Sequence, residues 1–264
     1  NDSLSAGYES LILCTPIPLR FHVDFGNHRR ELTKDLLLFH CNSKLTRRLS
    51  TTTMDCCKAD GTSKMKLHIL PPSANSHGCL AIVKALKLED KGLEIVNAYG
   101  KTRSEEFIAM NPCHCCPTLE FGGDKGAIWE SCACMRTLCQ LFEGGEKYYP
   151  QDPIIRGTID MVCDWKNTAF YPPFYHIAYI LFGVPVDEAK AKEDFKKICD
   201  ECFPILLDTF LKDTKFCYSD TPTIADLGVA PLLTLIKGRP KFWAKVPEGV
   251  KEYHTRVLGI PRGG

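Results

Sequence analysis

The chain has 264 residues, with 33 Lys and Arg against 32 Asp and Glu, and 44% of its residues are hydrophobic. This composition is ordinary for a globular protein of one large or two modest domains. A net charge of +1 gives no electrostatic reason to expect nucleic acid or an anionic membrane surface as a partner. The sequence has no apolar run of about 18 residues, so it predicts no membrane-spanning helix.

Fifteen cysteines are a high count, and two interpretations compete. An extracellular disulfide framework is typical of small, loop-rich chains. This chain is long, has its own apolar periodicity and places cysteines side by side, as in Cys115-Cys116. We therefore predict reduced, buried thiols and a cytoplasmic location.

Residues 1–64 lack any sustained helical or strand period, and Met54 and Met65 are both plausible translation starts. We expect this segment to be an N-terminal extension that is disordered or not native to the protein. A targeting peptide stays open as an alternative, although such peptides are poor in acidic residues. Three acidic residues count against it: Asp24, Glu31 and Asp35.

From Met65 the pattern sharpens into alternating strands and helices. The glycine-rich residues 122–126 predict the loop of a β-hairpin. Strands are expected at 66–70, 92–96, 118–121 and 127–129, and helices at 77–88, 105–110 and 131–142. This β-α-β-α-β-β-α order is that of a thioredoxin-like domain, and its βαβ unit predicts a parallel strand pair.

The second half of the chain shows no strand alternation. We predict a thioredoxin-like domain at 65–143, a linker at 144–152 and an all-helical bundle domain at 153–258. Helices are expected over 154–182, 187–212, 223–237 and 247–257. Thr223 and Asp226 have the spacing of a capping box at the start of the third of these helices.

Four motifs occur in order: Leu70-Pro-Pro-Ser-Ala74, Asn111-Pro-Cys-His-Cys-Cys-Pro-Thr-Leu119, Glu130-Ser-Cys-Ala133 and Thr223-Ile-Ala-Asp226. Together they resemble the motifs of the cytosolic glutathione S-transferase family, most closely its theta and delta classes. The resemblance covers about 190 residues, from Met65 to about Leu258. It implies the two-domain fold of that family, an α/β thioredoxin-like domain followed by an all-α domain.

The resemblance also implies an activity: an enzyme that conjugates glutathione, as co-substrate and without a metal, to a small hydrophobic electrophile in detoxification. Such proteins are commonly homodimers. The alternative is a non-catalytic interaction or assembly module of the same fold, like the elongation-factor gamma subunit, because fold alone does not settle function.

Within the second motif, the resemblance implies that Pro117 follows a cis peptide bond. The turn would leave the backbone N–H and C=O of Cys116 free to pair with the cysteinyl backbone of glutathione. His114 would contact the glycyl carboxylate. The alternatives are a proline that merely begins a strand and a histidine that is structural or solvated.

Glu130 and Ser131 would hold the γ-glutamyl end of glutathione. A helix N-terminus offers free N–H groups and a positive dipole end to a carboxylate, and Glu130 would face the substrate ammonium. The simpler interpretation is that Ser131 is an ordinary N-cap and Glu130 a first-turn acid.

Ser73 is the predicted catalytic residue. The thiolate is the nucleophile, and a free thiol with a pKa near 8.5 is mostly protonated at neutral pH. A hydroxyl that donates to sulfur at a helix N-terminus favours the charged form, and a drop of about 2 pKa units corresponds to roughly 2.7 kcal/mol. Ser76 is the alternative hydroxyl, and capping of the helix by Ser73 is the simpler interpretation.

Two departures from the family pattern put catalytic efficiency in doubt. Asn75, Ser76 and His77 stand where proline, a cysteine or serine, and arginine are usual. Cys132 stands where an arginine commonly follows the Glu-Ser pair, so a positive charge near the expected carboxylate is missing.

The cysteines around His114 were also weighed as a metal or redox site. Cys113 and Cys116 form one C-x-x-C pair, and Cys199 and Cys202 form another. The pairs fall in different predicted domains, and neither opens the first helix after strand one, where a redox pair would belong. We therefore expect no metal.

The electrophile pocket is expected at the first helices of the second domain. An aromatic-rich stretch lies there, and ordinary core packing is the alternative for any single member: Trp165, Phe170, Tyr171, Phe174, Tyr175 and Tyr179. Pro172-Pro173 is expected to kink or break the helix.

Overall fold

A computed structural model describes residues 64–259. The expected N-terminal extension lies outside the described residues, except for Lys64. Within the described part of the chain, no helix is long and apolar enough to cross a membrane. The described cysteines are all free, and most of them are buried.

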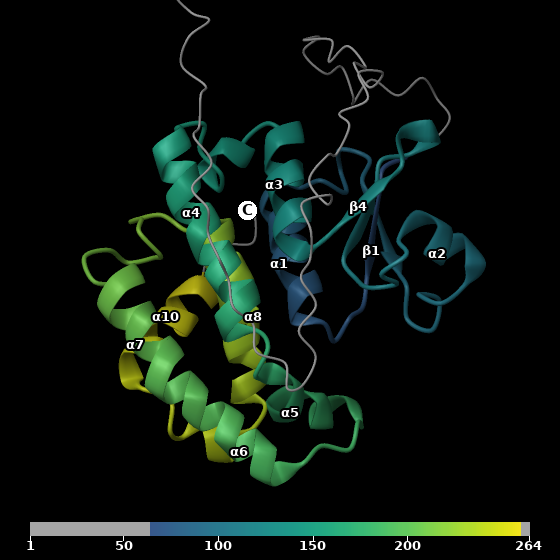
Figure 1. The fold of residues 1–264 in the computed structure, drawn as a ribbon. Coiled ribbons are helices and arrows are strands. Elements are labelled where there is room, and N and C mark those ends of the chain that lie inside the picture. The colour runs from purple at the N-terminus through teal and green to yellow at the C-terminus, as the bar shows by residue number, and fades with distance from the viewer. Residues whose placement is uncertain (1–63, 260–264) are drawn as a thin grey trace, which may run out of the picture. The chain divides into compact units, whose positions relative to one another are not determined.

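The first half of the described chain forms one four-stranded sheet (Figure 1). Its strands are β1 (Lys66–Ile69), β2 (Glu94–Asn97), β3 (Thr118–Glu120) and β4 (Ala127–Trp129), in the order β2-β1-β3-β4. β1 and β2 are parallel, while β3 is antiparallel to both of its neighbours. The predicted parallel pair, the hairpin and the β-α-β-α-β-β-α order are confirmed.

Helices cover both faces of this sheet (Figure 1). α1 (Ala74–Ala85) and α3 (Ser131–Leu141) lie on the face toward the second half of the chain, and α2 (Glu105–Met110) lies on the other. The first helix therefore begins and ends three residues earlier than the predicted 77–88. Sequence periodicity misses this start because Ser73 caps the helix and the turn that follows is polar.

Everything described after α3 is helical or irregular, apart from one isolated bridge between Phe216 and Ser219. The α-helices are α4 (Pro153–Trp165), α5 (Phe174–Ala178), α6 (Glu188–Lys197), α7 (Phe203–Ile205), α8 (Ile224–Lys237), α9 (Pro240–Trp243) and α10 (Glu248–Leu258). The proposed division at 65–143 and 153–258 agrees with this change of structure but stays a prediction.

The two long predicted helices are wrong in detail. The segment 154–182 contains an unexpected π-helical turn, Lys166–Phe170. The predicted break at Pro172-Pro173 is confirmed, because these prolines lack the N–H groups that would continue the ladder. The segment 187–212 changes to π-helical turns at Ile198–Cys202 and Leu206–Phe210. The short α9, which begins with a proline, was not predicted.

α8 is the helix around which the two halves of the described chain pack. It contacts α1, α3, α4, α5, α9 and α10, and one continuous hydrophobic core extends from the sheet into the helical part. The predicted capping box is confirmed, because Asp226 accepts from the Thr223 N–H at 2.8 Å. The carboxylate is fully buried and also accepts from Tyr253 at 2.9 Å and from the Cys217 N–H at 2.8 Å.

Candidate active site

The strand register gathers the predicted site residues at one edge of the sheet. His68, Thr118 and Trp129 lie side by side in β1, β3 and β4. The start of α1 follows β1, the peptide bond before Pro117 directly precedes β3, and the start of α3 follows β4, so all three lie at the same end of these strands. Segments far apart in the sequence thus end at a common edge, and Ser131 Oγ lies 3.4 Å from Asn75 Oδ1.

Ser73 and Ser76 have different roles at the start of α1. Ser73 is the half-buried N-cap, and its hydroxyl oxygen accepts from the Ser76 N–H at 3.4 Å. Because the oxygen is the acceptor there, the Ser73 hydroxyl proton is free to donate elsewhere. Ser76 is fully buried, and its hydroxyl accepts from the Leu70 N–H at 3.2 Å.

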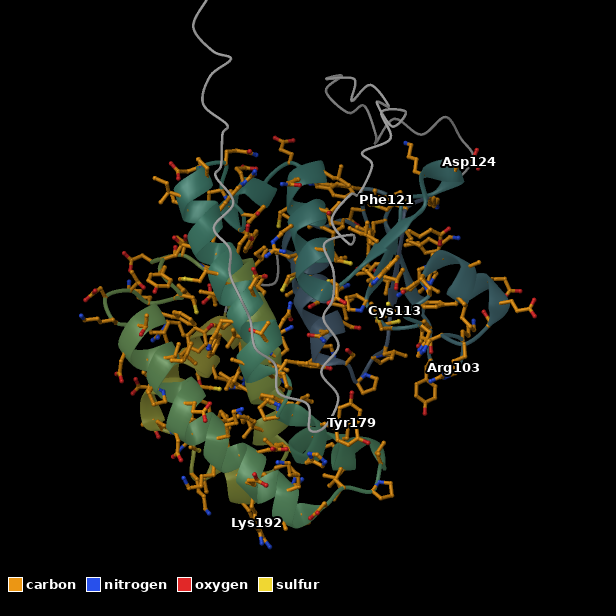
Figure 2. The ribbon with its side chains drawn as sticks, viewed as in Figure 1. Arg103, Cys113, Phe121, Asp124, Tyr179 and Lys192 are labelled. Atoms are coloured by element: carbon orange, nitrogen blue, oxygen red, sulfur yellow. The ribbon has the colours of Figure 1, made fainter. Side chains whose placement is uncertain are left out.

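The loop before β3 has the expected backbone geometry. The Cys116–Pro117 peptide bond is cis, and no hydrogen bond joins the Cys116 backbone to another described residue. Buried Asn111 holds the loop by donating to Cys115 O at 3.0 Å and to Thr118 Oγ1 at 2.8 Å. His114 is exposed at a backbone φ of 42°, and Cys113 beside it is exposed too (Figure 2).

The N-terminus of α3 has no side-chain cap. Glu130 occupies the N-cap position but makes no capping hydrogen bond, and its side chain is exposed. Its φ of 73° is unusual for a residue with a side chain. Ser131 follows as the first helical residue and is 5% exposed. The first N–H groups of α3 are therefore left without a partner from the helix's own sequence.

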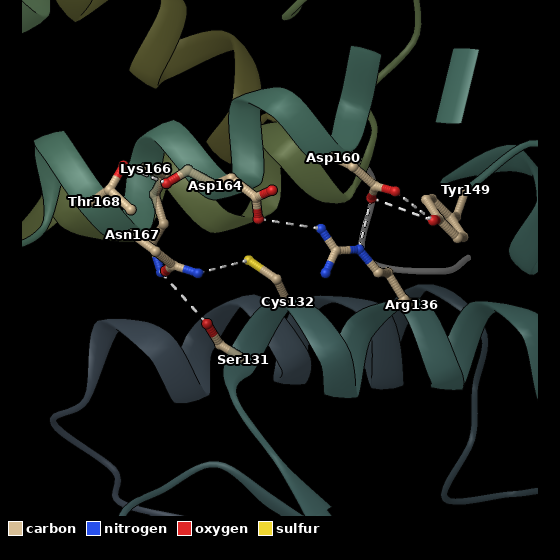
Figure 3. Close-up of polar contacts among 9 residues, drawn as sticks. All are labelled: Ser131, Cys132, Arg136, Tyr149, Asp160, Asp164, Lys166, Asn167 and Thr168. Atoms are coloured by element: carbon tan, nitrogen blue, oxygen red, sulfur yellow. Dashed lines mark hydrogen bonds and ion pairs between the residues drawn. The ribbon is translucent and has the colours of Figure 1, made fainter. Parts of the chain in front are cut away.

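A buried lysine that the sequence analysis missed stands behind Ser131 (Figure 3). Lys166 follows α4 directly and is 1% exposed. Its Nζ donates to Asn75 Oδ1 at 2.5 Å, to Asn167 Oδ1 at 3.0 Å and to Ser131 Oγ at 3.4 Å. A lysine inside an aromatic-rich helical stretch gives no sequence signal of burial, because lysine is one of the least buried residue types.

The thiols of Cys132 and Cys163 lie near this lysine. A hydrogen bond from Cys163, together with the charges of Lys166 and Arg136, lowers the pKa of the Cys132 thiol to about 6, against the effect of burial. Asn167 Nδ2 lies 3.8 Å from Cys132 Sγ. The environment of Cys132 therefore favours its thiolate form.

α3 is joined to α4 by an ion pair (Figure 3). Arg136 Nε lies 2.6 Å from Asp160 Oδ1, and the Tyr149 hydroxyl donates to both oxygens of the same carboxylate. Burial and the neighbouring Asp160 raise the pKa of Tyr149. This ion pair holds α3 against α4, and Cys132 of α3 and Lys166, which follows α4, lie near each other across the same contact.

The predicted aromatic stretch divides between core and cleft. Phe170 and Phe174 are buried core residues, and Trp165 stacks on Phe170. Tyr171 is half-buried, lies 5.4 Å below the Lys166 ammonium and has its pKa raised by burial. Core packing is thus the role of Phe170 and Phe174, as the alternative interpretation had it.

An apolar cavity of about 550 Å³ lies along α1, with α8 and α10 as its other walls, and none of the six predicted aromatic residues lines it. It begins at His77, one turn after Ser73, and includes Leu80, Ala81, Leu227 and Val257. Within residues 64–259, no group of three His, Cys, Asp or Glu side chains could hold a metal ion.

The chain is similar to solved glutathione transferases. An epsilon-class enzyme from the housefly Musca domestica is 26% identical, with a TM-score of 0.59 over 75% of this chain and 89% of that chain. A delta-class enzyme from Nilaparvata lugens is 24% identical, with a TM-score of 0.60 over 75% and 90%. A theta-class enzyme from Xanthomonas axonopodis, solved with glutathione bound, is 17% identical, with a TM-score of 0.61 over 76% and 95%.

No protein-family model matches the chain. The structural likeness shows the glutathione transferase fold, a thioredoxin-like domain followed by a helical domain. The similar structures come from the delta, epsilon and theta classes among others, so they do not place the chain in the theta or delta class.

Proposed function

We propose that the protein is a glutathione transferase in which Ser73 stabilises the thiolate of glutathione. The observation that carries the proposal is the meeting of three features at one sheet edge. These features are a free hydroxyl proton at the start of α1, an unpaired backbone beside a cis bond, and an uncapped α3 N-terminus. The likeness to glutathione transferase structures supports the same function, and it does not favour a non-catalytic interaction module.

In this proposal glutathione lies across the edge in an extended conformation. The backbone of Cys116, next to Pro117, pairs with the cysteinyl residue, as an added strand pairs with a sheet edge. The uncapped N–H groups at Ser131 bind the γ-glutamyl carboxylate, since such groups attract anions. Exposed Glu130 faces the γ-glutamyl ammonium, and exposed His114 contacts the glycyl carboxylate.

The conjugation reaction then requires that the thiolate of glutathione be stabilised. The glutathione thiol loses its proton to solvent, and the Ser73 hydroxyl donates to the resulting sulfur anion at the positive end of α1. The thiolate attacks a carbon of the electrophile, a C–S bond forms, and the electron pair leaves with the displaced halide. Ser73 is preferred to Ser76 for this role, because Ser76 is fully buried whereas Ser73 is half-buried.

We further propose that the second substrate is a hydrophobic electrophile, for which the apolar cavity beginning at His77 offers a site close to Ser73. A cytoplasmic, homodimeric enzyme stays our expectation. Sedimentation of the purified chain at micromolar concentration would give the mass of a dimer or refute it.

The test of the function combines binding and turnover. We expect retention on glutathione resin and conjugation of an activated aryl halide such as 1-chloro-2,4-dinitrobenzene. Ser73→Ala should lower kcat about 10- to 100-fold, the effect of losing roughly 1.4–2.7 kcal/mol of thiolate stabilisation, and should leave glutathione affinity nearly unchanged. Binding without turnover in the wild type would contradict the proposal and favour an interaction module.

A further inference from the structure

Lys166 is a buried cation surrounded by neutral hydrogen-bond partners. Its three acceptors are amide oxygens of Asn75 and Asn167 and the hydroxyl of Ser131. Among the described residues, no carboxylate forms an ion pair with it. An ammonium taken out of water without an anionic partner is costly, and burial lowers the pKa of Lys166.

The charged and titratable groups that face this ammonium are few. Cys132, Cys163 and Cys79 are thiols, and exposed Glu130 acts on the ammonium from a distance. Cys132, whose environment favours the thiolate form, has the largest charge effect on this ammonium among these groups. Asn75, the closest partner of the lysine, is only half-buried, so the cluster reaches the protein surface on that side.

The direction of the hydrogen bonds between Lys166, Ser131 and Asn75 decides which donors remain for a ligand. An ammonium can only donate, so Ser131 Oγ accepts from Lys166, and the Ser131 hydroxyl in turn donates to Asn75 Oδ1 at 3.4 Å. The result is a positive charge, hydrogen-bonded to Ser131 and Asn75, at the uncapped N-terminus of α3. Cys132, the next residue along, contributes no positive charge of its own.

We propose that Lys166 is a positioning residue for the γ-glutamyl α-carboxylate of glutathione, acting through Ser131 and Asn75 and supplying the positive charge that this end of the cleft otherwise lacks. The inference rests on the proposed function and deepens it. It makes the lysine, on the helical half of the molecule, the residue that selects thiols with an anionic N-terminal end.

The experiment compares three thiol peptides on the wild type and on Lys166→Met. Glutathione has both the α-carboxylate and the α-amine, 4-aminobutanoyl-Cys-Gly lacks only the carboxylate, and glutaryl-Cys-Gly lacks only the amine. Isothermal titration gives Kd, and steady-state conjugation separates KM from kcat. Exposed Lys196, which pairs with Asp200 far from the cleft, supplies the matched control Lys196→Met.

Lys166→Met should weaken glutathione and glutaryl-Cys-Gly about tenfold or more, the effect of one charge-assisted hydrogen bond. The variant should leave 4-aminobutanoyl-Cys-Gly unchanged and raise KM with little change in kcat. Lys196→Met should alter none of these values. Equal losses for all three peptides would mean a merely structural lysine and would overturn the inference.

A second result would also overturn it. If Lys166 serves only as counter-ion of the Cys132 thiolate, Lys166→Met will raise the pKa of that thiol, seen in its alkylation rate, and will leave all three peptide affinities unchanged. Cys132→Ser should bind glutathione at least as tightly as the wild type. Should Lys166→Met fail to fold, Lys166→Gln carries the same comparison. A wild type that binds no glutathione refutes the proposed function itself.

Discussion

The N-termini of α3 and α8 differ in how their free backbone N–H groups are satisfied. At α8, Thr223 and Asp226 form a complete capping box, and the buried carboxylate also accepts from Tyr253 and Cys217. At α3, the N-cap residue Glu130 caps nothing, and its backbone adopts a positive φ. One helix end is satisfied by its own chain, whereas the other is left open beside a buried cation.

The difference separates a structural polar cluster from a candidate binding site. Exposed helix ends normally find a partner in a side chain or water, and strained backbone persists only where the surrounding structure maintains it. The α8 cluster needs nothing further. The α3 cluster offers uncapped N–H donors with the positive charge of buried Lys166 close to them, a combination that suits a carboxylate. The predictions for Asp226 and Glu130 below test this contrast.

The largest expected effect is on stability at α8. Asp226→Ala should lower the free energy of unfolding by about 3–5 kcal/mol, because it leaves three buried donors without an acceptor. Those donors are the Thr223 and Cys217 N–H groups and the Tyr253 hydroxyl. Chemical denaturation of the wild type and the variant measures this loss in the free energy of unfolding. A loss below about 1 kcal/mol would mean that the cluster does not stabilise the helical half.

His254, on α10, offers a pH-dependent test of how α10 packs on the second half of α8. It is fully buried, and its Nε2 lies 2.9 Å from Thr234 Oγ1, whose proton goes to Ala230 O. The ring is therefore assigned as the Nε2–H tautomer, and Nδ1 has no partner. Burial, with Lys237 nearby, lowers the pKa of His254 from 6.5 to about 4.

Because the unfolded chain takes up this proton first, stability should fall as the pH drops from about 6.5 to 4. The contribution is about 2–3 kcal/mol over that window. Denaturation midpoints at several pH values, compared between the wild type and His254→Gln, measure it. If the two proteins show the same pH slope, His254 is not the group responsible.

A smaller effect is expected at the open end of α3. Glu130→Gly should raise stability by up to about 1 kcal/mol, since glycine adopts a positive φ without strain. The same change should weaken glutathione binding, because it removes the carboxylate proposed to face the substrate ammonium. A thermal melt with and without glutathione tests both effects. A variant that is less stable in the absence of ligand would argue against stored strain.

The smallest expected effect on the free protein is in the apolar cavity. Ala81→Trp should fill part of the space along α1 and reduce conjugation of bulky electrophiles more than of small ones. Glutathione affinity should stay unchanged, as titration would show. Equal rates with large and small electrophiles would place the second substrate elsewhere.

Much of the fold could be predicted from sequence. The parallel strand pair follows from the βαβ pattern, the hairpin from a glycine-rich loop, and the α8 cap from two residues three positions apart. The break at Pro172-Pro173 could also be predicted, but the π-helical turns after α4 and within 187–212 could not, because helical periodicity does not distinguish α from π turns.

The candidate site was predicted only in part. Ser73, Pro117 and Ser131 belong to local motifs, so their positions follow once the strands are paired. Lys166 and Asn75 meet across 91 positions of sequence, and neither has a local pattern that announces the contact. Long-range polar contacts of this kind depend on how the helical half packs on the sheet, which only a structure gives.

The central claim is that a hydroxyl at the start of α1 stabilises the glutathione thiolate. Its most direct test is a titration of the thiolate absorbance of bound glutathione, in the wild type and in Ser73→Ala. The account predicts that the pKa of bound thiol lies about 2 units below the free value near 8.5 and returns most of the way toward it in the variant. A pKa of bound thiol that is the same in both proteins would contradict the account.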